Sequence, residues 1–239
     1  MTMTTTTPFT DAYDRAFLRE TMMGPNAMRI TEELASSLPL RPGMRVLDLG
    51  CGKGISSILL TQKFGVTVFA ADLWISPTEN AQRFAALGLD DRIFPLRLDA
   101  TKEIPFAEDY FDAIISVDAY QYFGSNDTML PELLPYLKPG GHIAVAVPGF
   151  IGDYSEGNLP EVVKPFWTPE WYFFSRAWWK ALWEKAPGMA LSEPREMDCC
   201  TKAWDEFMEC PMAQEMMVPI MDAGAGAFFN IIELVGRRV

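Results

Sequence analysis

The chain has 239 residues, and its 20 Lys and Arg against 32 Asp and Glu give a formal net charge of −12. This charge argues against a nucleic-acid partner, because phosphate binding needs clustered basic residues. No apolar run reaches the roughly 18–20 residues of a membrane span, and the N-terminus has no signal-peptide pattern, so a cytoplasmic location is expected.

The first forty residues are predicted to form helices that precede the main domain. Residues 1–10 are expected to be disordered, and Asn26 is a typical N-cap for the second helix. We therefore expect residues 1–40 to be N-terminal helices or a lid, and residues 41–239 to form the main domain.

A buried strand that ends in a glycine-rich turn is predicted at residues 46–54, VLDLGCGKG, with a helix opening at Ile55. Glycine tolerates positive φ and lets a ligand approach the backbone, and a helix N-terminus offers unpaired N–H groups. These features are typical of a nucleotide-type ligand site. A dinucleotide fingerprint requires a third glycine where Ile55 stands, which argues against a dehydrogenase. Asp48 is a candidate cofactor ligand, and its alternative role is to cap the turn.

Three further apolar runs each end in an acid that is a candidate ligand. The runs are residues 66–72, 92–99 and 111–118, which end in Asp72, Asp99 and Asp118. Continuous apolar runs are typical of parallel strands buried on both faces, and ligands bind at the carboxyl ends of such strands. Asp72 is suited to accept hydrogen bonds from both hydroxyls of a ribose, and Asp99 from an adenine amino group.

With these features, the sequence resembles the class I S-adenosylmethionine-dependent methyltransferases. The motifs that carry the resemblance are VLDLGCGKG (46–54), Asp72, LDA (98–100), DYFDAIISVDAY (109–120) and LLPYLKPGGHIAVAVP (133–148). The resemblance implies an α/β fold with a doubly wound, mostly parallel seven-stranded sheet, the Rossmann-like methyltransferase fold. Residues 189–197 and 229–237 resemble its C-terminal antiparallel strand pair.

The resemblance also implies the cofactor, S-adenosyl-L-methionine, and the residues around it. Gly50, Cys51 and Gly52 would line its methionine part, and Asp72 would hold its ribose. Leu73 or Trp74 would flank the adenine, and Asp99 with Ala100 would contact the edge of the adenine. Ser116 would lie near the sulfonium.

The candidate catalytic residues follow the fourth strand and are Asp118, Tyr120 and Tyr122. If the chain stays extended there, alternate residues point the same way and all three face one pocket. Asp118 is suited to accept a proton or to hold a cationic acceptor. The tyrosines would supply hydrogen bonds or a cation–π surface, and their alternative role is to cover the edge of the core. The N-P-P-Y motif of many nitrogen methyltransferases is absent, which argues against transfer to nucleobase amino groups.

A fifth strand is predicted at residues 143–147, and two segments beyond it, about residues 148–185 and 201–226, are expected on the acceptor side. A helix is predicted from Thr168 to about Lys185, and its apolar stripe is predicted to comprise Trp171, Phe174, Trp178 and Leu182, widened by Trp179 and Trp183. This aromatic surface has three alternative roles: the core, the floor of an apolar substrate pocket, or the contact of a homodimer. The methionine-rich 201–226 segment either caps the acceptor pocket or packs as ordinary helices.

The sequence therefore predicts methyl transfer from S-adenosylmethionine to a small-molecule acceptor by in-line displacement. Two alternatives are a lipid-modifying enzyme similar to the cyclopropane-forming synthases and a non-catalytic regulator that binds the cofactor. The four cysteines, at positions 51, 199, 200 and 210, do not have the spacing of a disulfide framework or of a zinc site, so no metal is expected.

Overall fold

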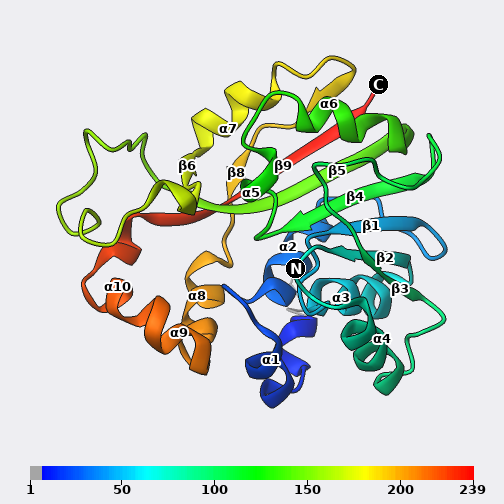
Figure 1. Ribbon diagram of the computed structural model, residues 1–239, viewed down its shortest axis with the longest axis horizontal. Coiled ribbons are helices and arrows are strands. Elements are labelled where there is room, and N and C mark those ends of the chain that lie inside the picture. The colour runs from blue at the N-terminus through cyan, green and yellow to red at the C-terminus, as the bar shows by residue number, and fades with distance from the viewer. Residues whose placement is uncertain (1–6) are drawn as a thin grey trace, which may run out of the picture.

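The computed structural model describes residues 7–239, in which a mostly parallel sheet runs through the middle of the molecule (Figure 1). The seven strands of its main path lie in the order β3 (Ile93–Arg97), β2 (Thr67–Asp72), β1 (Arg45–Leu49), β4 (Phe111–Val117), β5 (Leu137–Phe150), β9 (Phe229–Arg238) and β7 (Met189–Leu191). The first five strands are parallel, and β9 runs antiparallel to both β5 and β7. The predicted fold class, including the C-terminal antiparallel pair, is confirmed.

Two short strands lie off this path. β6 (Phe174–Ser175) pairs with the end of β5, and β8 (Arg195–Glu196) pairs with β9. The single strand predicted over residues 189–197 is wrong, because the chain leaves the sheet between β7 and β8. Pro194 lies in this gap, where a residue without an N–H group cannot donate to a strand ladder.

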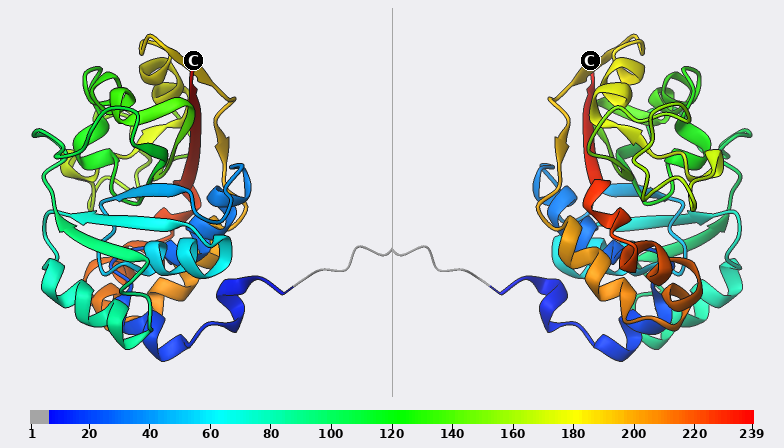
Figure 2. Two further views of the ribbon diagram at one scale, coloured as in Figure 1. Left: turned by 90° about the vertical axis from the view of Figure 1, so that its right-hand side faces the viewer. Right: turned by 90° about the vertical axis from the view of Figure 1, so that its left-hand side faces the viewer.

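Helices cover both faces of the sheet (Figure 2). The helices of one face are α2 (Ala27–Ser36), α3 (Ile55–Phe64), α4 (Pro77–Ala86) and α8 (Cys200–Met208). The helices of the other face are α5 (Gln121–Gly124), α6 (Met129–Leu133) and α7 (Arg176–Trp183). The remaining elements are α1 (Arg15–Thr21), α9 (Pro211–Met216), α10 (Val218–Asp222) and the 3₁₀ turns η1 (Phe9–Ala12), η2 (Leu134–Tyr136), η3 (Pro169–Trp171) and η4 (Ala225–Phe228). Neighbouring positions of β1 alternate between the two cores, as in a strand buried on both faces.

The N-terminal segment is fixed to the rest of the protein by polar contacts. Asn26 caps α2 as predicted, and its side chain accepts from the N–H groups of Met28 and Arg29. The disorder expected for residues 1–10 is wrong for η1, because Glu32 accepts from the backbone N–H groups of Phe9 and Thr10 at 2.7 and 2.9 Å. Residues 1–6 lie outside the described part of the chain.

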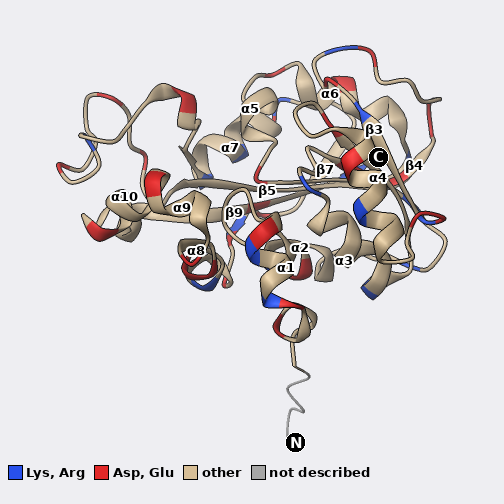
Figure 3. Ribbon diagram, turned by 60° about the horizontal axis from the view of Figure 1, so that its bottom comes forward, with Lys and Arg blue, Asp and Glu red and all other residues tan. Residues whose placement is uncertain are grey.

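Arg29, on α2, joins the N-terminal segment to α8. Figure 3 colours the acidic and basic residues of these helices. Its guanidinium donates to both carboxylate oxygens of Glu206, at 2.8 and 2.5 Å, and to Asp11 at 2.6 Å. The Arg29 side chain is only 7% exposed, so these groups are shielded from water. The segments 1–40 and 201–226, far apart in the sequence, are therefore held together by a buried ion pair.

Replacing Arg29 with leucine is expected to lower the free energy of unfolding by about 3–5 kcal/mol, because Glu206 is left as a largely buried charge without its partner. Urea denaturation measures this loss. The matched control is Arg19→Leu, since Arg19 pairs with Glu209 on the surface, where both side chains are about half exposed. The control is expected to cost less than about 1 kcal/mol. Equal losses in the two variants would contradict the importance of burial.

The helix predicted over residues 168–185 is wrong in its first half. η3 ends at Tyr172, whose left-handed backbone (φ 53°) turns the chain into β6. Ser175 then caps a new helix, α7, by accepting from the Trp178 N–H at 3.1 Å. This restart changes which residues face the core: Trp179 and Trp183 are fully buried, whereas Trp178 is only partly buried.

A third, smaller apolar cluster lies beyond the carboxyl end of β5. It consists of Phe150, Leu159, Val163, Ile220, Ala225 and Phe229. The cluster packs the long connection after β5 against α10 and η4, on the left of Figure 1. Across residues 7–239, no helix combines the length and apolarity needed to cross a membrane.

Candidate active site

The glycine-rich turn after β1 is anchored to the end of β2. The N–H groups of Gly50 and Cys51 both donate to the Ala71 carbonyl, at 2.8 and 3.0 Å. Gly50 has a left-handed backbone (φ 79°), and a Cβ there would lie 2.3 Å from the Cβ of Ala119. The turn thus needs glycine at this position both for its conformation and for its close approach to the segment after β4.

Asp48 supports this turn from beneath. Its carboxylate accepts from the hydroxyls of Ser56 and Ser57, both at 2.6 Å, in the first turn of α3. The side chain is fully buried, and burial raises the pKa of Asp48 to about 6, against the lowering effect of the two hydroxyls. Asp48 does not line the cavity described below, and it accepts from two side-chain hydroxyls of α3 instead of capping the turn itself.

Asp72 ends β2 and organises the backbone on two sides. One carboxylate oxygen accepts from the Gly52 N–H at 2.8 Å, and the other accepts from the N–H groups of Trp74 and Ile75 at 2.8 Å each. The carboxylate therefore holds the glycine-rich turn and the start of the next connection in fixed positions. The oxygen that accepts only from Gly52 keeps a further lone pair that a ligand hydroxyl is able to use.

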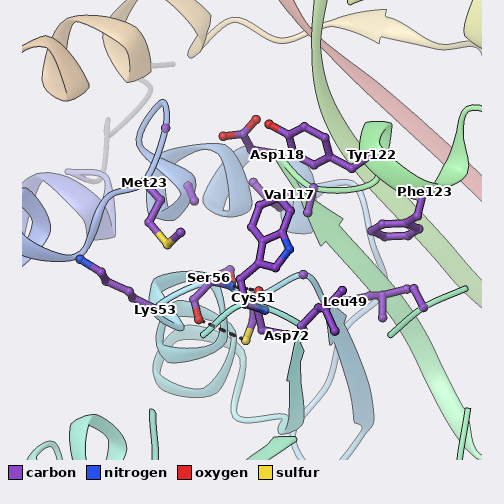
Figure 4. Close-up of a pocket in the computed structure, with 18 of the residues that line it drawn as sticks. Met23, Leu49, Cys51, Lys53, Ser56, Asp72, Val117, Asp118, Tyr122 and Phe123 are labelled. Carbon is purple, nitrogen blue, oxygen red and sulfur yellow. Dashed lines mark hydrogen bonds between the residues drawn. The ribbon is translucent and has the colours of Figure 1, made fainter. Parts of the chain in front are cut away.

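These elements enclose a cavity of about 290 Å³ at the carboxyl ends of β1, β2, β3 and β4 (Figure 4). Ten of the predicted site residues line it: Gly50, Cys51, Gly52, Asp72, Leu73, Trp74, Asp99, Ala100, Asp118 and Tyr122. Its position agrees with the rule that open α/β sheets bind ligands at the carboxyl ends of their strands.

Asp118 and Tyr122 lie beside each other at one end of this cavity (Figure 4). Asp118 has a left-handed backbone (φ 53°), and its carboxylate accepts from the side-chain amide of Gln121 at 3.2 Å. Burial raises the pKa of the Asp118 carboxyl to about 7. Burial and the charge of Asp118 raise the pKa of Tyr122.

Besides Asp48, two further predicted residues lie outside the cavity. Tyr120 is 1% exposed and packs against the rings of Trp179 and Trp183 on the α7 side of the sheet. The expected alternation failed because the chain does not stay extended: Asp118 is left-handed, and Tyr120 is already in a helical conformation as the N-cap of α5. Tyr120 is thus in its alternative role, covering the core.

Ser116 is the second of these residues. Its hydroxyl donates to the Leu49 carbonyl at 2.6 Å, and the residue is 1% exposed. It fixes the end of β1 directly before the glycine-rich turn, and it does not line the cavity.

The connection between α1 and α2 also lines the cavity, which the sequence analysis missed. Met23, Gly24 and Pro25 are the lining residues of this connection. A Cβ on Gly24 would lie 2.1 Å from a carboxylate oxygen of Asp118, so the absent side chain makes room for that carboxylate. The Gly-Pro pair between two helices marks a turn in the sequence, but nothing local indicates what the turn covers. Phe123 and Lys53 also line the cavity.

The segments expected on the acceptor side, residues 148–185 and 201–226, supply none of the lining residues. Tyr172 contacts a lining residue, Tyr122, with a distance of 6.1 Å between the ring centroids. The four cysteines are free thiols, and residues 7–239 contain no group of three His, Cys, Asp or Glu side chains arranged to hold a metal ion.

Comparison with known proteins agrees with this geometry. A family model for a methyltransferase domain matches residues 46–141. Methyltransferase GfsG of Streptomyces halstedii is 35% identical over 119 residues, which are 49% of this chain and 42% of the relative. The 27-O-demethylrifamycin SV methyltransferase of Amycolatopsis mediterranei is 30% identical over 118 residues, which are 49% of this chain and 43% of the relative. The chain thus spans less than half the length of these relatives.

The fold is also that of solved methyltransferases. Geranyl diphosphate methyltransferase in complex with S-adenosylmethionine superimposes with a TM-score of 0.71 over 90% of this chain and 86% of that one, at 18% identity. The glycine-rich turn, the acids at the ends of β2 and β3, the strand order and the matched domain lead to one conclusion. Residues 46–141 match the methyltransferase-domain family, and the chain as a whole has the fold of S-adenosylmethionine-dependent methyltransferases.

Proposed function

We propose that this protein transfers the methyl group of S-adenosylmethionine to a small-molecule acceptor by in-line displacement. The observation that carries this proposal is one cavity, which Asp99 also lines, with the glycine-rich turn and Asp72 at one side and Asp118 and Tyr122 at the other. One side has the groups that suit a nucleoside with an amino-acid tail. The other side offers polar and aromatic groups to a second molecule.

The donor would lie along the ends of β1, β2 and β3. Gly50, Cys51 and Gly52 would line its methionine part, and Asp72 would hold its ribose. The base would lie beside Leu73, with its edge at Asp99 and Ala100. Trp74 fits the acceptor side better, because its ring contacts Tyr122 at a centroid distance of 5.6 Å. Ser116 would act on the sulfonium region only by fixing the end of β1.

Methyl transfer from a sulfonium asks a protein mainly for alignment and exclusion of water. In this chain Met23, Gly24 and Pro25 would provide the cover, so the expected lid would be the α1–α2 connection rather than all of residues 1–40. The 201–226 segment would support this lid from behind through Arg29 and Glu206. The long connection after β5 would reach the acceptor only through Tyr172.

The names of the relatives support a small-molecule acceptor without selecting its chemistry. One named relative methylates a rifamycin oxygen, and the structural neighbour acts on geranyl diphosphate. Nothing favours the lipid-modifying or the non-catalytic alternative. Formation of S-adenosylhomocysteine with any member of a panel of amines, phenols, thiols and lipids tests the proposal. Tight cofactor binding with no transfer to any of them would instead support a regulator. The cytoplasmic location, the homodimer and the lack of a nucleic-acid partner stay predictions.

Replacing Asp72 with alanine is expected to weaken S-adenosylhomocysteine binding by about a hundredfold, because a charge-assisted hydrogen bond to the ribose and the bond that fixes Gly52 in the glycine-rich turn are both lost. Isothermal titration calorimetry measures this change. Asp91→Ala is the matched control, since Asp91 is exposed in the turn before β3 and does not line the cavity. Unchanged affinity in the Asp72 variant would overturn its assignment to the ribose.

A further inference from the structure

We propose that the methyl acceptor is an organic amine whose nitrogen binds between the carboxylate of Asp118 and the rings of Trp74 and Tyr122. This inference rests on the proposed methyl transfer and names the class of its acceptor. It is carried by the aromatic lining of the cavity, the unpaired state of Asp118 and the distribution of charge around the cavity.

The aromatic lining is unusually exposed. Trp74 is 70% exposed and Tyr122 is 46% exposed, and the Met23 and Leu73 side chains that line the same cavity are 37% and 44% exposed. The Trp74 and Tyr122 rings are 5.6 Å apart at 57°, and Tyr172 meets Tyr122 edge-on at 6.1 Å. Exposed apolar groups that gather at one cavity indicate a ligand site. Tilted aromatic faces attract an organic cation through their negative π surfaces.

Asp118 lacks a cationic partner. Among residues 7–239 it forms no ion pair, and its one side-chain hydrogen bond comes from the neutral amide of Gln121 at 3.2 Å. The carboxylate lies beside Tyr122. The left-handed backbone of Asp118 directs it there, and Gly24 leaves room for it because glycine has no side chain. A carboxylate in a largely dehydrated site is costly unless it is paired, and a ligand cation would provide the pairing.

The charges around the cavity disfavour an anionic acceptor. The acids that line it are Asp72, Asp99 and Asp118, and the lining contains one lysine, Lys53. The Lys53 ammonium is engaged with the Glu20 carbonyl at 2.8 Å. Asp72 already accepts three backbone N–H bonds, and Asp99 accepts from the Thr101 N–H and hydroxyl. Asp118 is therefore the lining carboxylate with most capacity for a cation.

The same groups suit the chemical step. An amine that arrives as an ammonium first gives one proton to the Asp118 carboxylate, and its lone pair becomes available. The nitrogen then attacks the methyl carbon of S-adenosylmethionine, the carbon–sulfur bond breaks, and its electron pair goes to sulfur. The product is a methylated ammonium with S-adenosylhomocysteine. The raised pKa of Asp118, about 7, suits a group that takes up a proton near neutral pH.

The test compares two probes of the same shape, choline and 3,3-dimethylbutan-1-ol, which differ in the positive charge. Calorimetry is done with the protein saturated by S-adenosylhomocysteine, so that the donor side is filled. We expect choline to bind at least about tenfold tighter than the alcohol. Asp118→Asn, which tolerates the left-handed backbone, and Tyr122→Leu are each expected to remove most of this preference.

The matched control is Phe94→Leu, which removes an exposed aromatic ring on β3 that does not line the cavity. It should keep the preference for choline. Equal binding of the two probes, no binding of either, or an unchanged preference in Asp118→Asn would each overturn the amine acceptor. If S-adenosylhomocysteine itself fails to bind the unmodified chain, the proposed methyl transfer fails instead.

Discussion

Replacing Gly50 with alanine is expected to abolish S-adenosylhomocysteine binding and to lower the free energy of unfolding by about 2–5 kcal/mol. The left-handed backbone at φ 79° costs an L-residue about 1–2 kcal/mol. The new methyl group would also lie 2.3 Å from the Cβ of Ala119, so the turn has to move. Movement breaks the bonds of the turn to the Ala71 carbonyl and displaces the Gly52 N–H from Asp72.

Gly43 offers a matched control for this variant. Its backbone is equally left-handed, at φ 83°, but a Cβ there has no atom within 4 Å. Gly43→Ala is expected to cost about 1–2 kcal/mol from backbone strain alone and to leave the cofactor affinity within about twofold. Urea denaturation and calorimetry on both variants measure the two effects. Wild-type cofactor affinity in Gly50→Ala would exclude this turn as the donor site.

The donor side of the cavity was predictable because its signals are local. A turn that needs left-handed backbone requires glycines, and these are visible in the sequence. Asp72 and Asp99 each follow an apolar run that is typical of a buried strand. Parallel strands bring their carboxyl ends to one edge, so residues far apart in the chain meet without further information. Ten predicted residues consequently line one cavity.

The acceptor side was predicted less well because its geometry depends on single backbone turns. Asp118 adopts a left-handed conformation, and this rotates Tyr120 toward Trp179 and Trp183 while Tyr122 stays at the cavity. Asp tolerates such a backbone, but its presence after a strand does not require one. In the same way, Ser175 restarts a helix that the tryptophan spacing alone extends back to Thr168.

Long-range pairing was the other missing information. The contact of Arg29 with Glu206 joins residues 177 positions apart, and it decides that the 201–226 segment supports the N-terminal helices and does not line the cavity. The Gly24 backbone reaches Asp118 for the same reason, since α1 is held against the body of the protein. Ion pairs between distant helices depend on tertiary packing, which no local pattern specifies.

Asp118→Asn is expected to stabilise the protein at alkaline pH while removing its preference for cations. The pKa of this carboxyl is raised from 3.8 to about 7 in the folded protein, so between these values the folded state holds more protons than the unfolded state. Stability therefore falls as the pH rises through this window. The variant cannot ionise at this position. Between pH 5 and pH 8 the stability of the variant should gain about 2–3 kcal/mol relative to that of the wild type.

Urea denaturation of both proteins at the two pH values measures this difference. Asp48, whose pKa is raised to about 6, has the same sign but is present in both proteins, so it cancels. The groups that face Asp118 are Gln121 and Tyr122 on its own segment and, across the cavity, Asp72, Asp99 and Lys53. A parallel pH dependence in the two proteins would show that Asp118 is ionised and satisfied without a ligand. A divergence would mean that the protein keeps a destabilising carboxylate at the acceptor site, and a bound cation should then reduce the divergence by pairing with it.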